Sequence, residues 1–331
     1  MRFFLVLLSV CLLAGCGVKT NGPLNLSFIG STRFTTGNRA GVGPGDTLAT
    51  RLYAITDTVT NTSNRLTRFQ VSVDYLPQRA PFAYPANINL FISNPPSELN
   101  VVYLDTVLSK RPKQRGDFLF TSVFGARTTS GTERWTYTLR DSARNSQARS
   151  FVLAVRRADS VAVYHDYLLK LPVPANTVSS RRFLDLKSGL ALPAYSVVGS
   201  TPNNELQKLT DVIVLPDGLR LVSPDSPDSA NMVLNKDRWP TANRSQTRFR
   251  LTRLTPTDFN GLQDVVGIQG QFAGPGRAYL STLAERQVYA FQVYKPDKTT
   301  PVYGLLLVSK LPNGTSSVGL QLEIRLAKQP L

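Results

Sequence analysis

The stretch Arg68-Phe69-Gln70-Val71-Ser72-Val73-Asp74-Tyr75 decides the fold class, because apolar and polar side chains alternate along it without a break. Successive side chains of a β-strand point to opposite faces of a sheet, so this period of two predicts a strand with one buried face. The same alternation recurs in residues 134–139 and 151–155. Further strands are predicted over residues 47–56, 88–92, 101–108, 118–124 and 161–171.

Short strands separated by turns rich in Pro, Gly, Asn and Ser are typical of an immunoglobulin-like β-sandwich, which we expect over residues 24–171. Residues 172–182 break the pattern with a proline-rich and then polar segment, which predicts a linker. Residues 183–331 are again rich in strands and form the second predicted domain. We therefore expect a mainly β protein with two tandem β-sandwich-like domains.

The second domain carries its clearest strand at the end, where Leu322, Ile324 and Leu326 alternate with Glu323 and Arg325. Other strands are predicted over residues 212–215, 247–254, 287–294 and 303–308, and the last one over 317–326.

One short helix is expected in this domain. Thr255 can cap its start, Pro256 suits its first position, and Phe259, Leu262 and Val266 would share one face.

The chain opens with Met1-Arg2 and then a short apolar run that ends in Leu13-Ala14-Gly15-Cys16. Its roughly 12 helical residues would span about 18 Å, short of the roughly 30 Å of a bilayer core, so residues 1–15 predict a secretory signal. The end of the run resembles the lipobox of bacterial lipoproteins, which implies cleavage before Cys16 and attachment of lipid to its thiol. Residues 16–23 are small or polar and predict a flexible tether.

This resemblance implies an envelope location anchored to a membrane through the N-terminal lipid. Gly17 is not the aspartate that retains enterobacterial lipoproteins in the inner membrane, so the outer membrane is favoured. Lys19 is the one charged residue just after the cysteine, whereas acidic residues there mark surface export in Bacteroidetes. A periplasm-facing orientation is therefore slightly favoured over the cell surface.

The second domain also carries a resemblance. Phe183-Leu184-Asp185-Leu186-Lys187-Ser188-Gly189, then Val288-Tyr289-Ala290-Phe291, Tyr303-Gly304-Leu305-Leu306-Leu307-Val308 and the last strand are together similar to the C-terminal domain of uncharacterised Bacteroidetes lipoproteins. This resemblance covers roughly residues 180–331 and implies no activity. The whole architecture resembles that of SusE-type glycan-binding lipoproteins, at the level of domain order alone.

The net charge of +16 predicts attraction to polyanions. In an envelope these are lipopolysaccharide and other anionic polysaccharides, and the basic residues 110–115 are the densest patch. A solvated sheet face explains most of the arginines equally well, including Arg244, Arg248, Arg250 and Arg253. No nucleic-acid-binding motif accompanies them, so no nucleic-acid role is expected.

Residue types that carry chemistry are scarce. His165 is the one histidine, and of the two cysteines Cys11 leaves with the signal and Cys16 is acylated. No metal site, cofactor or catalytic residue is therefore predicted. The glycine-rich segment Gly274-Pro275-Gly276 lacks the Gly-Lys-Ser/Thr ending of a phosphate loop and predicts a turn.

Two other features suggest sites. Trp239 follows no strand pattern and could stack on a sugar ring, although a loop tryptophan that caps the core is the more frequent case. An Asp followed by Ser or Thr and then a small or apolar residue recurs along the chain, which is similar to the O-glycosylation acceptor of Bacteroidetes, and ordinary turn chemistry explains it equally well. Glycans would sit on Thr47, Thr58, Thr106, Ser142, Ser160 and Ser229.

The sequence as a whole favours a non-enzymatic, lipid-anchored envelope protein with a binding or scaffolding role. An accessory glycan-binding lipoprotein of an outer-membrane uptake system is the first alternative. A hydrolase is the second, because only folding could bring two carboxylates together.

Overall fold

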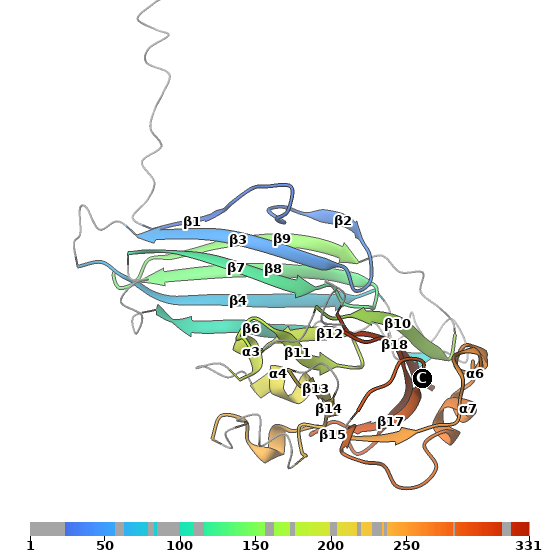
Figure 1. Cartoon of the computed structure of the whole chain (residues 1–331). Helices are drawn as coiled ribbons and strands as arrows, with labels where there is room; N and C mark the ends of the chain where they lie inside the picture. Colours follow the sequence, from blue (N-terminus) through green and yellow to red (C-terminus); the bar gives the residue numbers. More distant parts are fainter. Residues whose placement is uncertain are drawn as a thin grey trace, which may run out of the picture.

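The computed structural model describes residues 24–56, 63–78, 83–84, 99–108, 116–155, 162–172, 176–198, 204–216, 220–226, 234, 237–280, 282–312 and 319–330. Strands dominate it, and helices are few and short (Figure 1). The expectation of a mainly β protein with sandwich-like parts is confirmed.

The first part of the chain forms two facing sheets, which we call the N-terminal sandwich (upper part of Figure 1). A three-stranded sheet has the order β1-β3-β7, and a five-stranded sheet has the order β2-β9-β8-β4-β6. The strands are β1 (Leu24–Phe28), β2 (Arg39–Val42), β3 (Thr47–Thr56), β4 (Leu66–Pro77), β6 (Leu99–Val107), β7 (Asp117–Gly125), β8 (Gly131–Asp141) and β9 (Ser146–Val155).

Alternation predicts six of these eight strands, whereas β1 and β2 lie outside the predicted ranges. β3 has the predicted bounds, and on β4 the side chains of Phe69, Val71, Val73 and Tyr75 are buried as expected. β4 pairs antiparallel with both β6 and β8, which places these residues in the middle of the sheet. The strand expected over residues 88–92 lies outside the described residues.

The second part contains two five-stranded sheets. The inner sheet, with the order β12-β11-β13-β14-β16, consists of β11 (Arg181–Asp185), β12 (Leu190–Pro193), β13 (Val212–Val214), β14 (Leu221–Val222) and β16 (Tyr279–Leu280). The outer sheet, with the order β10-β19-β18-β17-β15, consists of β10 (Tyr164–Lys170), β15 (Gln246–Leu251), β17 (Val288–Tyr294), β18 (Val302–Lys310) and β19 (Gln321–Ala327).

β10 differs from its sequence-based assignment. The alternation in residues 161–171 predicts a last strand of the first sandwich, but β10 pairs with β19 over its whole length, from Tyr164 opposite Ala327 to Lys170 opposite Gln321. Alternation reveals that one face of a strand is buried and does not reveal which neighbour it pairs with. The outer sheet therefore takes its edge strand from the segment that precedes the predicted linker.

Buried apolar side chains join these sheets in layers. One hydrophobic cluster fills the N-terminal sandwich and continues into the inner sheet and its helices through Phe183, Leu192 and Trp239. A second cluster lies between the inner and outer sheets, and a third covers the far face of the outer sheet. Because the outer sheet is buried on both faces, β18 is apolar at successive positions from Gly304 to Val308 instead of alternating.

Four short α-helices lie in the described residues, where the sequence predicts one. Thr255 and Asp258 form the expected capping box, and Phe259 is buried. The prediction fails at Val266, whose side chain is 79% exposed, because the helix stops and a second one starts after the new N-cap Asp264. The helical segments are α3 (Ala194–Val197), α4 (Asn204–Leu209), α6 (Pro256–Gly261), α7 (Val265–Gly270) and the 3-10 turn η3 (Thr241–Asn243).

A short parallel pairing joins the two parts of the chain at its end. β20 (Gln329–Pro330) lies beside β5 (Ala83–Tyr84), a segment that follows β4 of the N-terminal sandwich.

Candidate ligand-binding site

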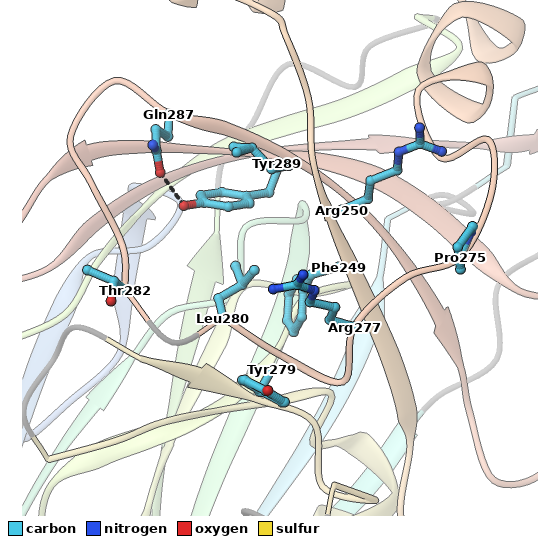
Figure 2. A pocket seen from close by; sticks show the side chains of 10 residues that line it. Phe249, Arg250, Pro275, Arg277, Tyr279, Leu280, Thr282, Gln287 and Tyr289 are labelled. Atoms are coloured by element: carbon cyan, nitrogen blue, oxygen red, sulfur yellow. Dashed lines mark hydrogen bonds between the residues drawn. The ribbon is translucent and has the colours of Figure 1, made fainter.

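A pocket of about 420 Å³ opens beside β15 in the second part of the molecule (Figure 2). It lies within the range of volumes that small-molecule sites occupy, about 300–1,000 Å³. β15, the segment from Pro275 to Thr282 and the start of β17 supply its walls. We call it the Arg250–Arg277 pocket after its two cationic side chains; the lining residues are Phe249, Arg250, Leu251, Pro275, Arg277, Tyr279, Leu280, Thr282, Gln287 and Tyr289.

The pocket forms because the chain after α7 returns to lie along β15. Phe249 and Arg277 exchange backbone hydrogen bonds, each N–H donating to the other carbonyl oxygen at 2.8 Å. Two glycines permit this close return: Gly274 has a φ of +99°, and a Cβ there would lie 2.8 Å from the Arg250 guanidinium. A Cβ at Gly276 would lie 2.6 Å from the ring of Phe272. The turn predicted at these glycines is thus the segment that forms one wall of the pocket.

The floor of the pocket is apolar and aromatic. Phe249, Leu280 and Tyr289 are all buried. Figure 2 shows the Tyr289 ring and Leu280 facing each other across the hollow, with Gln287 at the phenol end of the ring. Burial raises the pKa of Tyr289, so its phenol stays protonated at neutral pH and donates to Oε1 of Gln287.

The rim of the pocket is exposed and carries positive charge. Tyr279 is 41% exposed, which leaves its ring accessible, and Arg250 extends toward the turn at Pro275 (Figure 2). Within the described part of the chain, no carboxylate lies within ion-pair distance of Arg250 or Arg277. The neighbouring Arg248 differs, because it makes two hydrogen bonds to Asp225 at 2.9 and 2.7 Å.

The arrangement can bind a ligand that combines an anionic group with a flat or apolar face. Guanidinium groups donate several hydrogen bonds in a fixed geometry that matches carboxylate, sulfate and phosphate oxygens. None of the residues that line the pocket is an aspartate, glutamate, histidine or cysteine. Among the described residues, no cluster of three such side chains could hold a metal ion. The lining therefore offers guanidinium, phenol, hydroxyl and amide groups beside an apolar surface.

The predicted sites fall elsewhere. Trp239 is fully buried, packs against Phe183 at a ring-centroid distance of 6.1 Å, and donates from Nε1 to the carbonyl oxygen of Asn243. Arg244 holds the same loop, because its guanidinium donates to the Trp239 carbonyl oxygen. Stacking of Trp239 on a sugar is therefore wrong, since no face of its ring is accessible to a ligand.

The proposed glycan acceptors differ in exposure, and the structure describes only some of them. Thr47 and Ser142 are exposed, whereas Thr58, Ser160, Ser229 and the lipidation site Cys16 lie outside the described residues. Thr106 is only 8% exposed, which contradicts its assignment as an acceptor in the folded protein. The reason is an irregularity in the pairing of β6 with β4 next to Tyr103, which changes the side chains that face the core.

His165 is a structural histidine. It is 5% exposed, and its Nε2 lies 3.0 Å from the hydroxyl of Thr128 in the N-terminal sandwich. Thr128 also bonds to Ser188 through its backbone N–H and its hydroxyl, both at 2.9 Å. These contacts connect the sandwich to the hairpin between β11 and β12.

A buried charge cluster stabilises that hairpin. Lys295 Nζ lies 3.2 Å from Oδ1 of Asp185 and 2.7 Å from Oδ1 of Asp211, and it donates to the Leu209 carbonyl oxygen at 2.6 Å. Asp185 also accepts from the hydroxyl of Ser188. The segment from Phe183 to Gly189, which carries the sequence resemblance, is thus the segment that supplies the first of these carboxylates.

The two carboxylates of this cluster differ in acidity. Burial raises the pKa of Asp211 to about 7, because desolvation outweighs the nearby Lys295 ammonium. Burial also opposes ionisation of Asp185, but Lys295 and the Ser188 hydroxyl hold its pKa below the ordinary value. Lys295 itself has a raised pKa, because the two carboxylates outweigh its own desolvation. The cluster is enclosed and distinct from the pocket, so we assign it to stability.

Comparison with known proteins adds no function. No known protein family and no curated protein matches the chain. Among solved structures, the chain is similar to a DUF4466 family protein from Parabacteroides merdae, with 11% identity, a TM-score of 0.30, and coverage of 92% of this chain and 99% of that one. It is also similar to Spo0M, a sporulation control protein from Bacillus subtilis, with 7% identity, a TM-score of 0.24, and coverage of 88% and 76%.

Neither similarity supports an inference about this chain, since both TM-scores lie well below 0.5. In a separate observation, none of the helices in the described residues is long and apolar enough to cross a membrane.

Proposed function

We propose that this chain is a non-enzymatic, lipid-anchored protein of the outer membrane that binds a saccharide in the Arg250–Arg277 pocket. The observation that carries the proposal is the composition of the pocket: the exposed side chains of Tyr279 and Arg277 lie at the rim of an aromatic floor, and no carboxylate lines it. Saccharide sites combine an aromatic face with polar groups that fix orientation. A glycoside hydrolase needs two carboxylates across its substrate, which this lining does not supply.

The anchor in this proposal depends on Cys16. Wild-type protein expressed in a Gram-negative host should incorporate labelled palmitate and begin at residue 16 after processing. The Cys16→Ser variant should incorporate none and leave the membrane fraction. An unlabelled wild-type protein, or a mature N-terminus at another residue, would remove the anchor and the outer-membrane location with it.

Binding is tested with the mature full-length protein in detergent on an array of neutral and acidic glycans. Tyr279→Ala should weaken binding about tenfold, because it removes the exposed ring. Tyr53→Ala is the matched control, since Tyr53 lies on β3 of the N-terminal sandwich. Absence of binding to every glycan, or an equal loss in both variants, would contradict the proposal.

Glycan attachment is a separate proposal. Thr47 and Ser142 are the described acceptors with exposed side chains, although the Ser142 hydroxyl already bonds to Asn64 and Arg65 in a turn. The intact mass of native protein tests the proposal. A mass equal to peptide plus lipid alone would leave turn chemistry as the explanation of the motif.

A further inference from the structure

We infer that the N-terminal sandwich rests on a phospholipid bilayer through the outer face of its three-stranded sheet. We call this face the bilayer-facing patch; it consists of Tyr53 and Ile55 on β3 and Leu119 and Val123 on β7. The inference rests on the proposed lipid anchor and adds to it the side that the molecule turns toward the membrane.

Strand pairing gathers the patch on one face. Tyr53 lies directly opposite Leu119, and Ile55 lies opposite Asp117 on the same face. Ile55 and Leu119 are therefore diagonal neighbours, about 7–8 Å apart, which is within contact distance for aliphatic side chains. Ile55, Leu119 and Val123 are 40%, 54% and 42% exposed, although all three are aliphatic. Exposed apolar side chains that gather on one face mark an interaction surface, whereas single ones need no explanation.

The opposite outer face of the sandwich is polar at its centre. Ser72 on β4 lies opposite Thr136 on β8, which lies in turn opposite Ser150 on β9. The neighbouring row pairs Gln70 with Thr138. Both faces belong to one sandwich with a shared core, so sandwich packing does not explain why only one centre is aliphatic. The difference indicates different surroundings for the two faces.

The anchored end of the chain leaves the sandwich beside the patch. β1 starts at Leu24, and this residue pairs with Thr56, the neighbour of Ile55 in the sequence. Leu24 follows the proposed lipidation site Cys16 by eight residues. Even a fully extended chain of this length reaches only about 29 Å, roughly the thickness of one bilayer core. The three-stranded sheet is therefore held close to the membrane, which is our reason for choosing a bilayer as the occupant of the patch.

Side chains typical of a membrane interface border the patch. The Arg51 guanidinium lies 4.4 Å from the ring centroid of Phe34, and its Nε donates to the Thr121 hydroxyl at 3.2 Å. The Tyr53 phenol donates to Asp117 at 3.0 Å, which gives this carboxylate a partner at the rim. Arginine and tyrosine combine an apolar body with a polar end, so they suit the headgroup level of a phospholipid leaflet.

This orientation leaves the Arg250–Arg277 pocket open to a ligand. β1 and β3 lie at the top of the molecule in Figure 1, whereas β15, which lines the pocket, lies at the bottom. The core of the sandwich and the inner sheet lie between them. A bilayer in contact with the bilayer-facing patch is therefore on the side of the molecule away from the pocket.

The test uses the mature acylated protein in vesicles of phosphatidylethanolamine and phosphatidylglycerol. Cys16 is the one cysteine left after cleavage, and its thiol carries the lipid, so a Leu119→Cys variant takes a fluorescent NBD label at one position. Ala148→Cys is the matched control, because it is an exposed position on β9 of the opposite outer face. Side chains at an interface lie about 5–10 Å into the headgroup and acyl boundary, so doxyl-labelled lipid should quench the label at position 119 about twofold and leave the label at 148 unchanged.

A pair of double variants tests whether the aliphatic side chains hold the face against lipid. With the label on Ile55→Cys, Leu119→Thr/Val123→Thr should lose at least half of the quenching by doxyl-labelled lipid. Val102→Thr/Val152→Thr removes two aliphatic side chains from the opposite outer face and should retain it. Threonine suits a β-strand, so both variants should fold, and urea unfolding checks this. An equal loss of quenching in both variants would overturn the inference.

The outcomes separate the inference from the anchor. An acylated protein whose label at 119 is quenched no more than its label at 148 overturns the inference and leaves the anchor standing. A label at 119 that is shielded from aqueous iodide but not quenched by doxyl-labelled lipid overturns it in favour of a second copy of the chain on the patch. A protein that carries no lipid overturns both the anchor and the inference.

Discussion

Lys295→Met tests whether the buried charge cluster holds the inner and outer sheets together. The Lys295 side chain is 13% exposed, and those of Asp185 and Asp211 are 3% and 2% exposed. Removal of the ammonium leaves two carboxylates buried near each other, with Arg127 and Lys187 as the remaining cations that act on them. Breaking a buried ion pair in this way costs about 3–5 kcal/mol of unfolding free energy, and we expect that loss at pH 8.

The unfolding free energy lost in Lys295→Met should be smaller at lower pH, and the pKa of Asp211 explains the direction of this change. Its folded pKa of about 7 lies above the ordinary value of 3.8, so the folded protein binds the extra proton between these limits. In that window Asp211 contributes less stability as the pH rises. Without Lys295 both carboxylates hold protons more tightly, so the variant should lose stability more steeply with rising pH than wild type does.

Equilibrium urea unfolding followed by tryptophan fluorescence measures the effect, because Trp135 and Trp239 are both buried. Lys298→Met is the control: this side chain is 66% exposed and 4.0 Å from its nearest carboxylate, so the change should stay within about 0.5 kcal/mol. The reasoning is refuted if Lys295→Met retains wild-type stability at pH 8, or if its loss is larger at pH 5 than at pH 8.

Three further predictions concern stability. As the pH rises from 4 to 8, the unfolding free energy of Asp211→Asn should increase by a few kcal/mol relative to that of wild type, because the variant lacks a carboxylate whose folded pKa is raised. Parallel curves of stability against pH would contradict this. Trp239→Ala should lower the unfolding free energy by about 3–5 kcal/mol and leave saccharide affinity unchanged once the protein is folded, as calorimetry at low temperature will show. Gly189→Ala should cost about 1–3 kcal/mol in urea unfolding, because φ is +69° and the new Cβ would lie 2.3 Å from Thr128; an unchanged midpoint would disprove that.

Much of the fold follows from local patterns in the sequence. Alternation predicts β3 with its observed bounds, and the cap at Thr255 marks the start of α6. These signals work because one buried face, or one satisfied helix end, is a property of a few neighbouring residues. β10 shows the limit, since its pairing with β19 joins segments about 150 residues apart in the chain.

Burial by a distant element explains the other errors. Arg325 lies on the polar side of the last strand, yet it is 6% exposed because α6 and its C-terminal carbonyls cover it. Trp239 belongs to no strand, yet Phe183 and the Arg244 guanidinium enclose it. Phe183 and α6 are both far in sequence from the residue that they bury, so the sequence next to that residue does not reveal them.

The pocket could be predicted only in part. Arg250 belongs to an arginine-rich stretch whose expected role is a solvated sheet face, and Gly274-Pro275-Gly276 predicts a turn. The missing information was that Arg277 pairs with Phe249, which brings the turn beside the strand. A basic, glycine-flanked turn close in sequence to Tyr279 was the one signal that could have suggested the site.

The hydrophobic cluster that runs from the N-terminal sandwich into the inner sheet has a consequence for cooperativity. Trp135 and Trp239 belong to this one cluster although they are about 100 residues apart. A protein built this way should melt in a single step, so tryptophan fluorescence and far-UV circular dichroism of the wild-type protein should report the same unfolding midpoint. The N-terminal sandwich expressed by itself should then expose an apolar surface and aggregate, and ligand bound near β15 should protect amides throughout the cluster from hydrogen exchange.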